Sequence, residues 1–162
     1  MDKSLLRTDE EKEFSKIYYL HVDAVFRLCF TYLKNEADTE DAVQEVFIKL
    51  LKHKGKFESE EHRKAWLIVT ASNYCKNVLK HWWRKRKDID DYAEIIGNKG
   101  FEIDEMMELV LALPDKYKAV VYLYYYEGYN SSQIAKMLHK PESTIRSHLS
   151  SARNMLKKEL IK

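Results

Sequence analysis

The segment from Ser131 to Arg153 carries side chains that could contact DNA. It reads as two short helices joined by the turn "HKPE", a length that helix-turn-helix units use. Apolar residues at helical spacing give each helix a face that packs on the other. Polar side chains beside that face can donate to phosphates or base edges: Thr144, Arg146, Ser147, His148, Ser150 and Ser151. An ordinary hairpin with a solvated face fits the same pattern, and His139 stands where such turns usually have glycine.

A second polar stripe, on a helix expected near residues 61–86, suits a single nucleic-acid strand. Aromatic rings stack on bases, amides read exposed edges, and cations hold the backbone. The stripe recurs at alternating spacings of four and three and ends in "KHWWRKRK": Trp66, Thr70, Asn73, Asn77, Lys80 and Arg84. The alternative is that the tryptophans belong to the core and the basic tail is solvated.

An acidic stripe lies on a helix expected near residues 38–53. Asp38, Asp41 and Glu45 are three and four residues apart, and Gln44 is adjacent. Because the apolar face lies on the other side, the stripe is free to bind a basic partner protein. A plain solvated face is the competing interpretation.

These stripes need helices to position them, and the pattern predicts an all-α fold. Only four glycines and two prolines interrupt the chain. The predicted helices cover residues 9–33, 38–53, 61–86, 104–112, 114–127, 131–138 and 143–159. The pattern fades from Asp88 to Asp104, so we expect two small helical domains, residues 1–87 and 105–162, joined by an acidic linker at 88–104.

Charge is segregated along the chain although the net charge is only +2. Residues 1–87 carry a net charge of +4 and residues 109–162 one of +5, whereas residues 88–108 carry −7. Two basic blocks on either side of an acidic strip suggest two domains that bind a polyanion.

Several classes of protein are excluded or disfavoured. Cys29 and Cys75 stand apart from any Cys/His cluster, so we expect two reduced core thiols and no metal. The sequence lacks a phosphate-binding loop, a zinc-protease motif and a nucleophile triad, so we expect no enzyme and no cofactor. No apolar run approaches the ~20 residues of a membrane span, and we expect a cytoplasmic protein without membrane insertion.

The blocks together resemble an extracytoplasmic-function sigma factor, a minimal specificity subunit of bacterial RNA polymerase. "DTEDAVQEVFIKLL" is similar to the family's region 2.2, and "FESEEHRKAWLIVTASNYCKNVLKHWWRKRK" to regions 2.3 and 2.4. The segment from Leu111 to Leu160 resembles region 4. The resemblance implies a region 2 bundle of three to four helices and a region 4 helix-turn-helix domain.

The resemblance also implies roles for the stripes. The acidic stripe, with Asp38, Asp41, Gln44 and Glu45, would bind the clamp helices of core RNA polymerase, and region 4 would bind the polymerase flap. Phe57 and Asn73 would form the pocket for a base flipped from the minus-ten element, lined by His53 and Thr70. Asn77, Lys80 and Arg84 would hold the melted strand. Thr144, Arg146, Ser147, His148, Ser150 and Ser151 would face the duplex minus-thirty-five element.

The sequence departs from the family pattern at several of these places. His148 and Ser151 stand where arginine is frequent, which predicts weaker duplex affinity. Arg63 occupies a usual aromatic position near the flipped-base pocket. An anti-sigma protein is an expected partner. The main rival interpretation is a free-standing helix-turn-helix regulator that binds duplex DNA as a dimer, and it leaves both stripes of residues 1–87 unused.

Overall fold

In a computed structural model, residues 8–85 and 105–161 are described, and they form helices and no strand. The helices are α1 (Asp9–Leu33), α2 (Glu36–Lys52), α3 (Glu60–Lys85), α5 (Glu105–Ala112), α6 (Asp115–Tyr125), α7 (Ser131–Leu138) and α8 (Glu142–Ile161). The all-α prediction is confirmed, and every predicted helix lies within about two residues of an observed one. The predicted acidic linker at 88–104 lies outside the described residues.

Helices α1, α2 and α3 form the first half of the molecule. Thr8 caps α1 by accepting a hydrogen bond from the Glu11 amide at 3.2 Å. Asn35 does the same for α2, accepting from the Asp38 amide at 2.9 Å. The turn between these helices is tight because Lys34 ends α1 in the left-handed conformation, with φ of 64°. The three helices therefore pack closely around one apolar core, which includes both buried cysteines.

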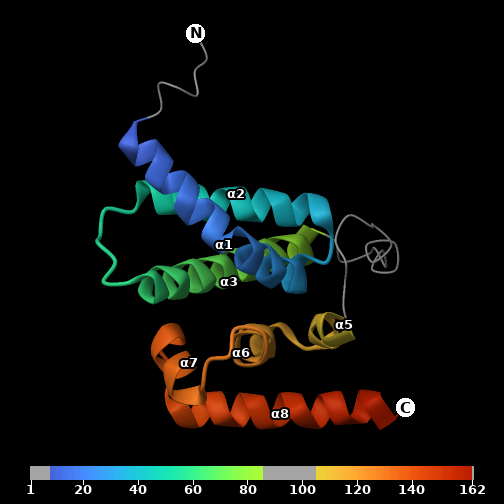
Figure 1. Cartoon of the computed structure of the whole chain (residues 1–162). Helices are drawn as coiled ribbons and strands as arrows, with labels where there is room; N and C mark the ends of the chain where they lie inside the picture. Colours follow the sequence, from blue (N-terminus) through green and yellow to red (C-terminus); the bar gives the residue numbers. More distant parts are fainter. Residues whose placement is uncertain (1–7, 86–104, 162) are drawn as a thin grey trace.

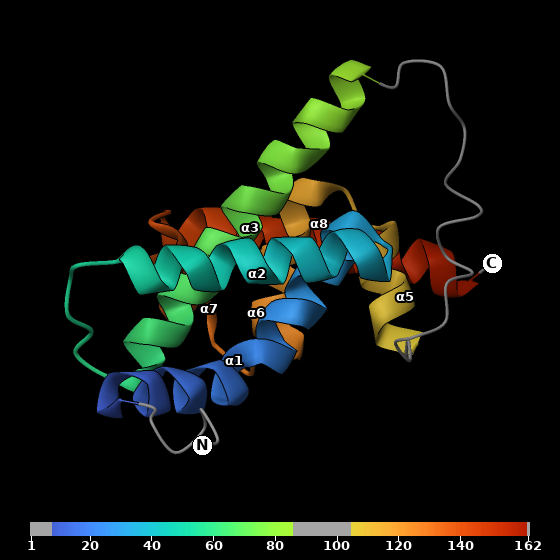
Figure 2. The ribbon, with the colours of Figure 1, turned by 90° about the horizontal axis from the view of Figure 1, so that it is seen from above.

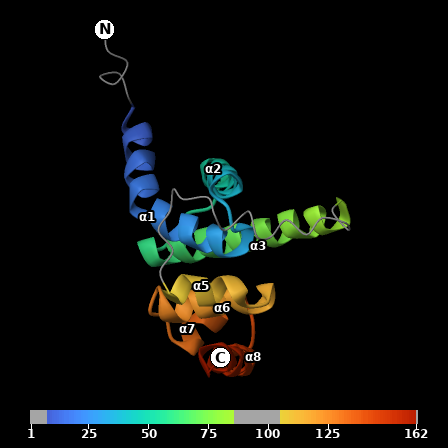
Figure 3. The ribbon, with the colours of Figure 1, turned by 90° about the vertical axis from the view of Figure 1, so that its right-hand side faces the viewer.

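Helices α5 to α8 form the second half, beneath the first in Figures 1 and 3. Asn130 and Gln133 make the reciprocal capping box that starts α7, as their spacing predicts. His139 ends α7 in the left-handed conformation, with φ of 54° and ψ of 47°, although glycine is the usual residue there. The α7–α8 pair is thus a helix-turn-helix unit closed by a histidine.

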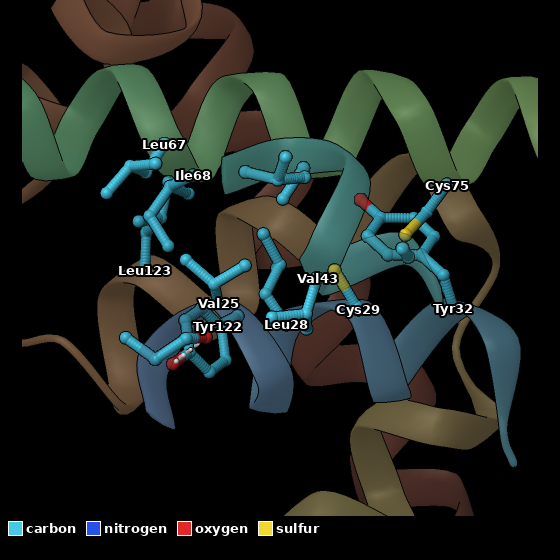
Figure 4. Close-up of a cluster of buried hydrophobic side chains, with 14 of the residues drawn as sticks. Val25, Leu28, Cys29, Tyr32, Val43, Leu67, Ile68, Cys75, Tyr122 and Leu123 are labelled. Carbon is cyan, nitrogen blue, oxygen red and sulfur yellow. Dashed lines mark hydrogen bonds between the residues drawn. The ribbon is translucent and has the colours of Figure 1, made fainter. Parts of the chain in front are cut away.

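One large hydrophobic core spans both halves. Leu67 and Ile68 of α3 face Leu123 of α6, and Val25 of α1 lies near Tyr122 (Figure 4). Each of these side chains is almost completely buried. We call this contact between α1, α3, α6 and α7 the seam. In the described arrangement the two halves form one packed body.

Polar contacts also cross the seam. Lys118 of α6 is only 1% exposed, and its ammonium donates to the carbonyl of Thr31 on α1 at 2.6 Å. The same ammonium pairs with Asp115 at 3.2 Å. Tyr122 donates to the carbonyl of Ala24 at 3.0 Å. These contacts satisfy polar groups that the seam removes from water.

No helix in the described residues is long and apolar enough to cross a lipid bilayer.

Candidate nucleic-acid and protein interface

The acidic stripe lies on the outer face of α2. Asp41 and Gln44 are exposed, and Asp38 and Glu45 are half-buried. The opposite face of α2 is fixed in the core by three buried side chains, Val43, Val46 and Phe47. A well-packed helix therefore holds the stripe and presents three carboxylates, those of Asp38, Asp41 and Glu45, on one side.

An aromatic cluster joins the loop after α2 to the first turns of α3. The rings of His53 and Phe57 stack with centroids 4.9 Å apart, and the ring of Trp66 lies 4.9 Å from His53 and 5.8 Å from Phe57. Gly55 makes this approach feasible, because a Cβ there would lie 2.8 Å from His53 Nε2. The loop thus brings His53 and Phe57 to the same side of the molecule as Trp66.

Arg63 completes this cluster. Its guanidinium lies over the Phe57 ring, 5.2 Å from the centroid. Glu60 holds Arg63 through an ion pair and also accepts a hydrogen bond from the buried His21 at 2.8 Å. The hydrogen bond from His21 is the main reason that the pKa of Glu60 lies below its ordinary value, so this carboxylate stays charged. His21 thereby anchors this end of α3, a contact between residues 39 positions apart that helical spacing does not reveal.

The polar stripe of α3 continues from Trp66 along one side of the helix. Thr70 is half-buried, whereas Asn73, Asn77 and Lys80 are exposed. The C-terminal end of α3 extends beyond the other helices (Figure 2). Arg84 lies in α3, but its side chain is outside the described part of the chain. The aromatic cluster and the exposed amides therefore form one continuous surface that can stack on bases and bind their edges.

The second predicted DNA surface lies on α8. Arg146, Ser147 and Ser150 are exposed, and Thr144 and Ser151 are half-buried. Ile145 and Leu149 fix the helix against Ile134 and Ala135 of α7, as the apolar spacing predicts. Glu142 lies 3.7 Å from the Arg146 guanidinium, an exposed pair that contributes little to stability and that a phosphate could displace.

His148 has a different environment from the other side chains of this set. Its ring packs edge-on against Tyr117 of α6 at 5.3 Å, and its Nδ1 is buried without a partner among the described residues. Burial lowers the pKa of His148 below 6.5, and Lys140, Lys116 and Lys76 lower it further. A neutral ring turned towards α6 is a poor ligand for phosphate, so His148 supports the recognition helix more than it extends its surface.

Arg153 is a basic residue on α8 that sequence reasoning missed. Its Nε donates to the Tyr125 hydroxyl at 3.0 Å, and its guanidinium lies 5.4 Å from the Tyr124 ring centroid. The spacing of seven residues from Arg146 places both on one side of α8, a signal that the sequence offered. Arg153 therefore extends the basic surface of the recognition helix by two turns.

Comparison with protein families matches both halves of the chain. Residues 17–88 match the model of sigma-70 region 2, and residues 103–156 match the model of sigma-70 region 4. The two matches follow the same order as the two halves of the fold.

Characterised relatives span almost the whole chain. It is similar to the ECF RNA polymerase sigma factor SigW of Bacillus subtilis, with 23% identity over 96% of this chain and 92% of the relative. Similarity to SigM of the same organism reaches 27%, over 88% of this chain and 91% of the relative. Among solved structures, the sigma factor RpoE of Bartonella quintana, in complex with the anti-sigma factor NepR, has a TM-score of 0.68. That match has 20% identity and covers 92% of this chain and 97% of RpoE.

Proposed function

The chain belongs to the extracytoplasmic-function sigma factors, which bind core RNA polymerase and direct promoter-specific initiation. We propose that each of the three surfaces described above binds a different target: the polymerase, the melted promoter strand or the promoter duplex. The observation that carries the proposal is that these surfaces lie on separate elements of one chain, α2, α3 and α8. The work is binding without a catalytic step, and it takes place in the bacterial cytoplasm, where polymerase and promoter lie.

The acidic stripe of α2 binds the clamp helices of the polymerase. Asp41 and Gln44 are exposed and free to pair with basic side chains, and Asp38 and Glu45 flank them. Such charge complementarity speeds association and fixes the orientation of the partner. Region 4 adds a contact with the polymerase flap.

The aromatic cluster and the stripe of α3 capture the melted minus-ten strand. Phe57 and His53 offer stacking surfaces, and Thr70 and Asn73 lie one and two turns beyond Trp66. A flipped base costs a few kcal/mol in lost stacking and pairing, which the pocket must offset. Stacking contributes about 1–3 kcal/mol per base, so two or three such contacts suffice. Asn77, Lys80 and Arg84 then hold the strand along the projecting end of α3.

The outer face of α8 reads the duplex minus-thirty-five element. Arg146, Ser147 and Ser150 are its most exposed members, with Thr144 and Ser151 at the edges. One arginine and several hydroxyls make few phosphate contacts, so affinity for free duplex is low. Binding becomes effective when the polymerase holds both modules near the promoter at high local concentration.

Binding both elements at once requires the seam to open. The minus-ten and minus-thirty-five elements lie about 25 base pairs apart, or roughly 85 Å at 3.4 Å per base pair. In the packed chain α3 and α7 are in contact, and α8 packs on α7. Residues 1–87 and 105–162 therefore act as two modules that separate on the polymerase, with residues 88–104 as their connector.

An anti-sigma protein is the regulatory partner that we propose. The solved RpoE structure with the same fold is a complex with the anti-sigma factor NepR. A protein of this kind would hold the chain inactive by covering the surfaces of α2 or α3.

Gel shifts with promoter DNA test the proposal against a free-standing duplex regulator. We expect a shift with the chain and core polymerase together and none with the chain alone. The variant Asp41→Arg with Glu45→Arg should lose the shift, while Glu10→Arg with Glu13→Arg on the exposed start of α1 should retain it. A full shift by the chain alone would support the regulator and overturn the proposal.

A further inference from the structure

A cavity of about 400 Å³ lies where α1 ends, α2 begins and α3 leaves the bundle. Its lining comes from all three helices: Leu33, Asp38, Asp41, Tyr74, Asn77, Val78, His81 and Trp82. Asp38 and Asp41 belong to the acidic stripe, and Asn77 belongs to the strand-binding stripe. The remaining wall residues have no role in the functions proposed above.

One wall of the cavity is acidic. Asp38 accepts a hydrogen bond from the Asn35 amide at 2.6 Å, which leaves its other oxygen available. In the described part of the chain, no lysine or arginine forms an ion pair with Asp38 or Asp41. Burial raises the pKa of Tyr74, and the nearby carboxylates of Glu45 and Asp41 raise it further.

The facing wall is aromatic and apolar. Tyr74, Val78 and Trp82 of α3 are half-buried and pack against the core. A cation with a flat or apolar body fits between two such walls, because carboxylates attract its charge and the face of an indole attracts it as well. A nucleotide does not fit, because its phosphate would meet both carboxylates.

We propose that this cavity receives an arginine side chain of the core RNA polymerase. A guanidinium can donate a forked pair of hydrogen bonds to Asp41 while its plane lies on Trp82, which the ammonium of lysine cannot do. The inference rests on the proposed function, in which the acidic stripe binds the polymerase. It adds the aromatic wall of α3 to that surface. The polymerase-binding surface and the strand-binding stripe are then neighbours on α3, because Asn77 of the stripe also lines the cavity.

Titration of labelled chain with core polymerase tests this inference. Asp41→Asn and Trp82→Leu should each weaken binding by about tenfold, the effect expected for one charge-assisted pair or one desolvated cation–π contact. Glu40→Gln is the matched control, an exposed carboxylate on α2 outside the cavity, and should change affinity less than about twofold. The double variant Asp41→Asn with Trp82→Leu should lose much less than the product of the two single losses, because both residues bind one side chain.

The outcomes separate this inference from the function on which it rests. Circular dichroism first establishes that each variant is folded, and Trp82→Phe replaces Trp82→Leu if the latter is not. The arginine site would be overturned if the Trp82 variant bound polymerase as tightly as the parent. It would also be overturned if the loss of affinity in the double variant equalled the product of the two single losses. Either result would leave the polymerase-binding role of the acidic stripe intact. Parent-like binding by Asp41→Arg with Glu45→Arg would remove the polymerase-binding role of the stripe itself.

Discussion

The burial of Lys118 at the seam makes the free energy of unfolding depend on pH, and this dependence can be measured. Its ammonium is almost fully buried between α6 and α1, where it donates to Thr31 and lies 5.6 Å from the Tyr32 ring centroid. Replacing Lys118 with methionine keeps most of the side-chain volume and removes the charge. The comparison of the two proteins isolates the contribution of a single buried amine.

The sign and size follow from the pKa of Lys118. Burial, and after it the charge of Lys34, lowers this pKa from 10.5 to about 8. Between these values the unfolded chain binds more protons than the folded chain, so stability rises with pH. This gain in unfolding free energy is complete above about pH 10.5 and is lost as the pH falls through about 8. From pH 7 to pH 9.5 the unfolding free energy rises by about 2 kcal/mol because of Lys118.

Urea unfolding at pH 7 and pH 9.5 provides the measurement. The free energy of unfolding of Lys118→Met, relative to the parent, should fall by about 2 kcal/mol between the two pH values. Thiols and tyrosines titrate in both proteins and cancel in this difference. Lys116→Met, an exposed neighbour on α6, serves as the control and should show no such change. A difference for Lys118→Met that stays constant within about 0.5 kcal/mol would refute the buried position of the amine.

Three further substitutions test separate parts of the molecule. Asn73→Ala should leave polymerase binding intact but reduce promoter opening about tenfold, since one base-edge contact is worth about 1–3 kcal/mol; permanganate reactivity of the melted strand as strong as the parent's would argue against this. Arg146→Ala should reduce the salt slope of promoter binding by the assembled polymerase by about 0.9 if Arg146 contacts one phosphate, and an unchanged slope would exclude that contact. His139→Gly should raise the unfolding free energy by about 0.5–1 kcal/mol, because glycine adopts the left-handed backbone without strain; a lower melting temperature would contradict this reasoning.

Local features of the fold were predictable because local signals specify them. The capping pair of Asn130 and Gln133 and the turn at His139 depend on residues that are neighbours in sequence. The buried faces of α1 and α8 follow from apolar spacings of three and four. The exposed positions of Asn73, Asn77 and Lys80 follow from the same periodicity.

The seam was not predictable in this way. Periodicity tells which side of a helix is buried but not which helix covers it, so the shared core of α3 and α6 could not be foreseen. Lys118 would ordinarily be assigned to the surface, although its position four residues before Tyr122 places it on the same side of α6. Convergence of His53, Phe57 and Trp66 likewise depends on a loop path that passes close to Gly55. Contacts between distant segments require the three-dimensional arrangement.

In vitro transcription with purified core polymerase tests the central claim most directly. Genomic DNA of the source bacterium would be transcribed with and without the chain, and the 5′ ends of the transcripts would be mapped. The account predicts a small set of start sites that appear only with the chain, and their loss with Phe57→Ala combined with Asn73→Ala. Identical start sites with and without the chain would contradict it.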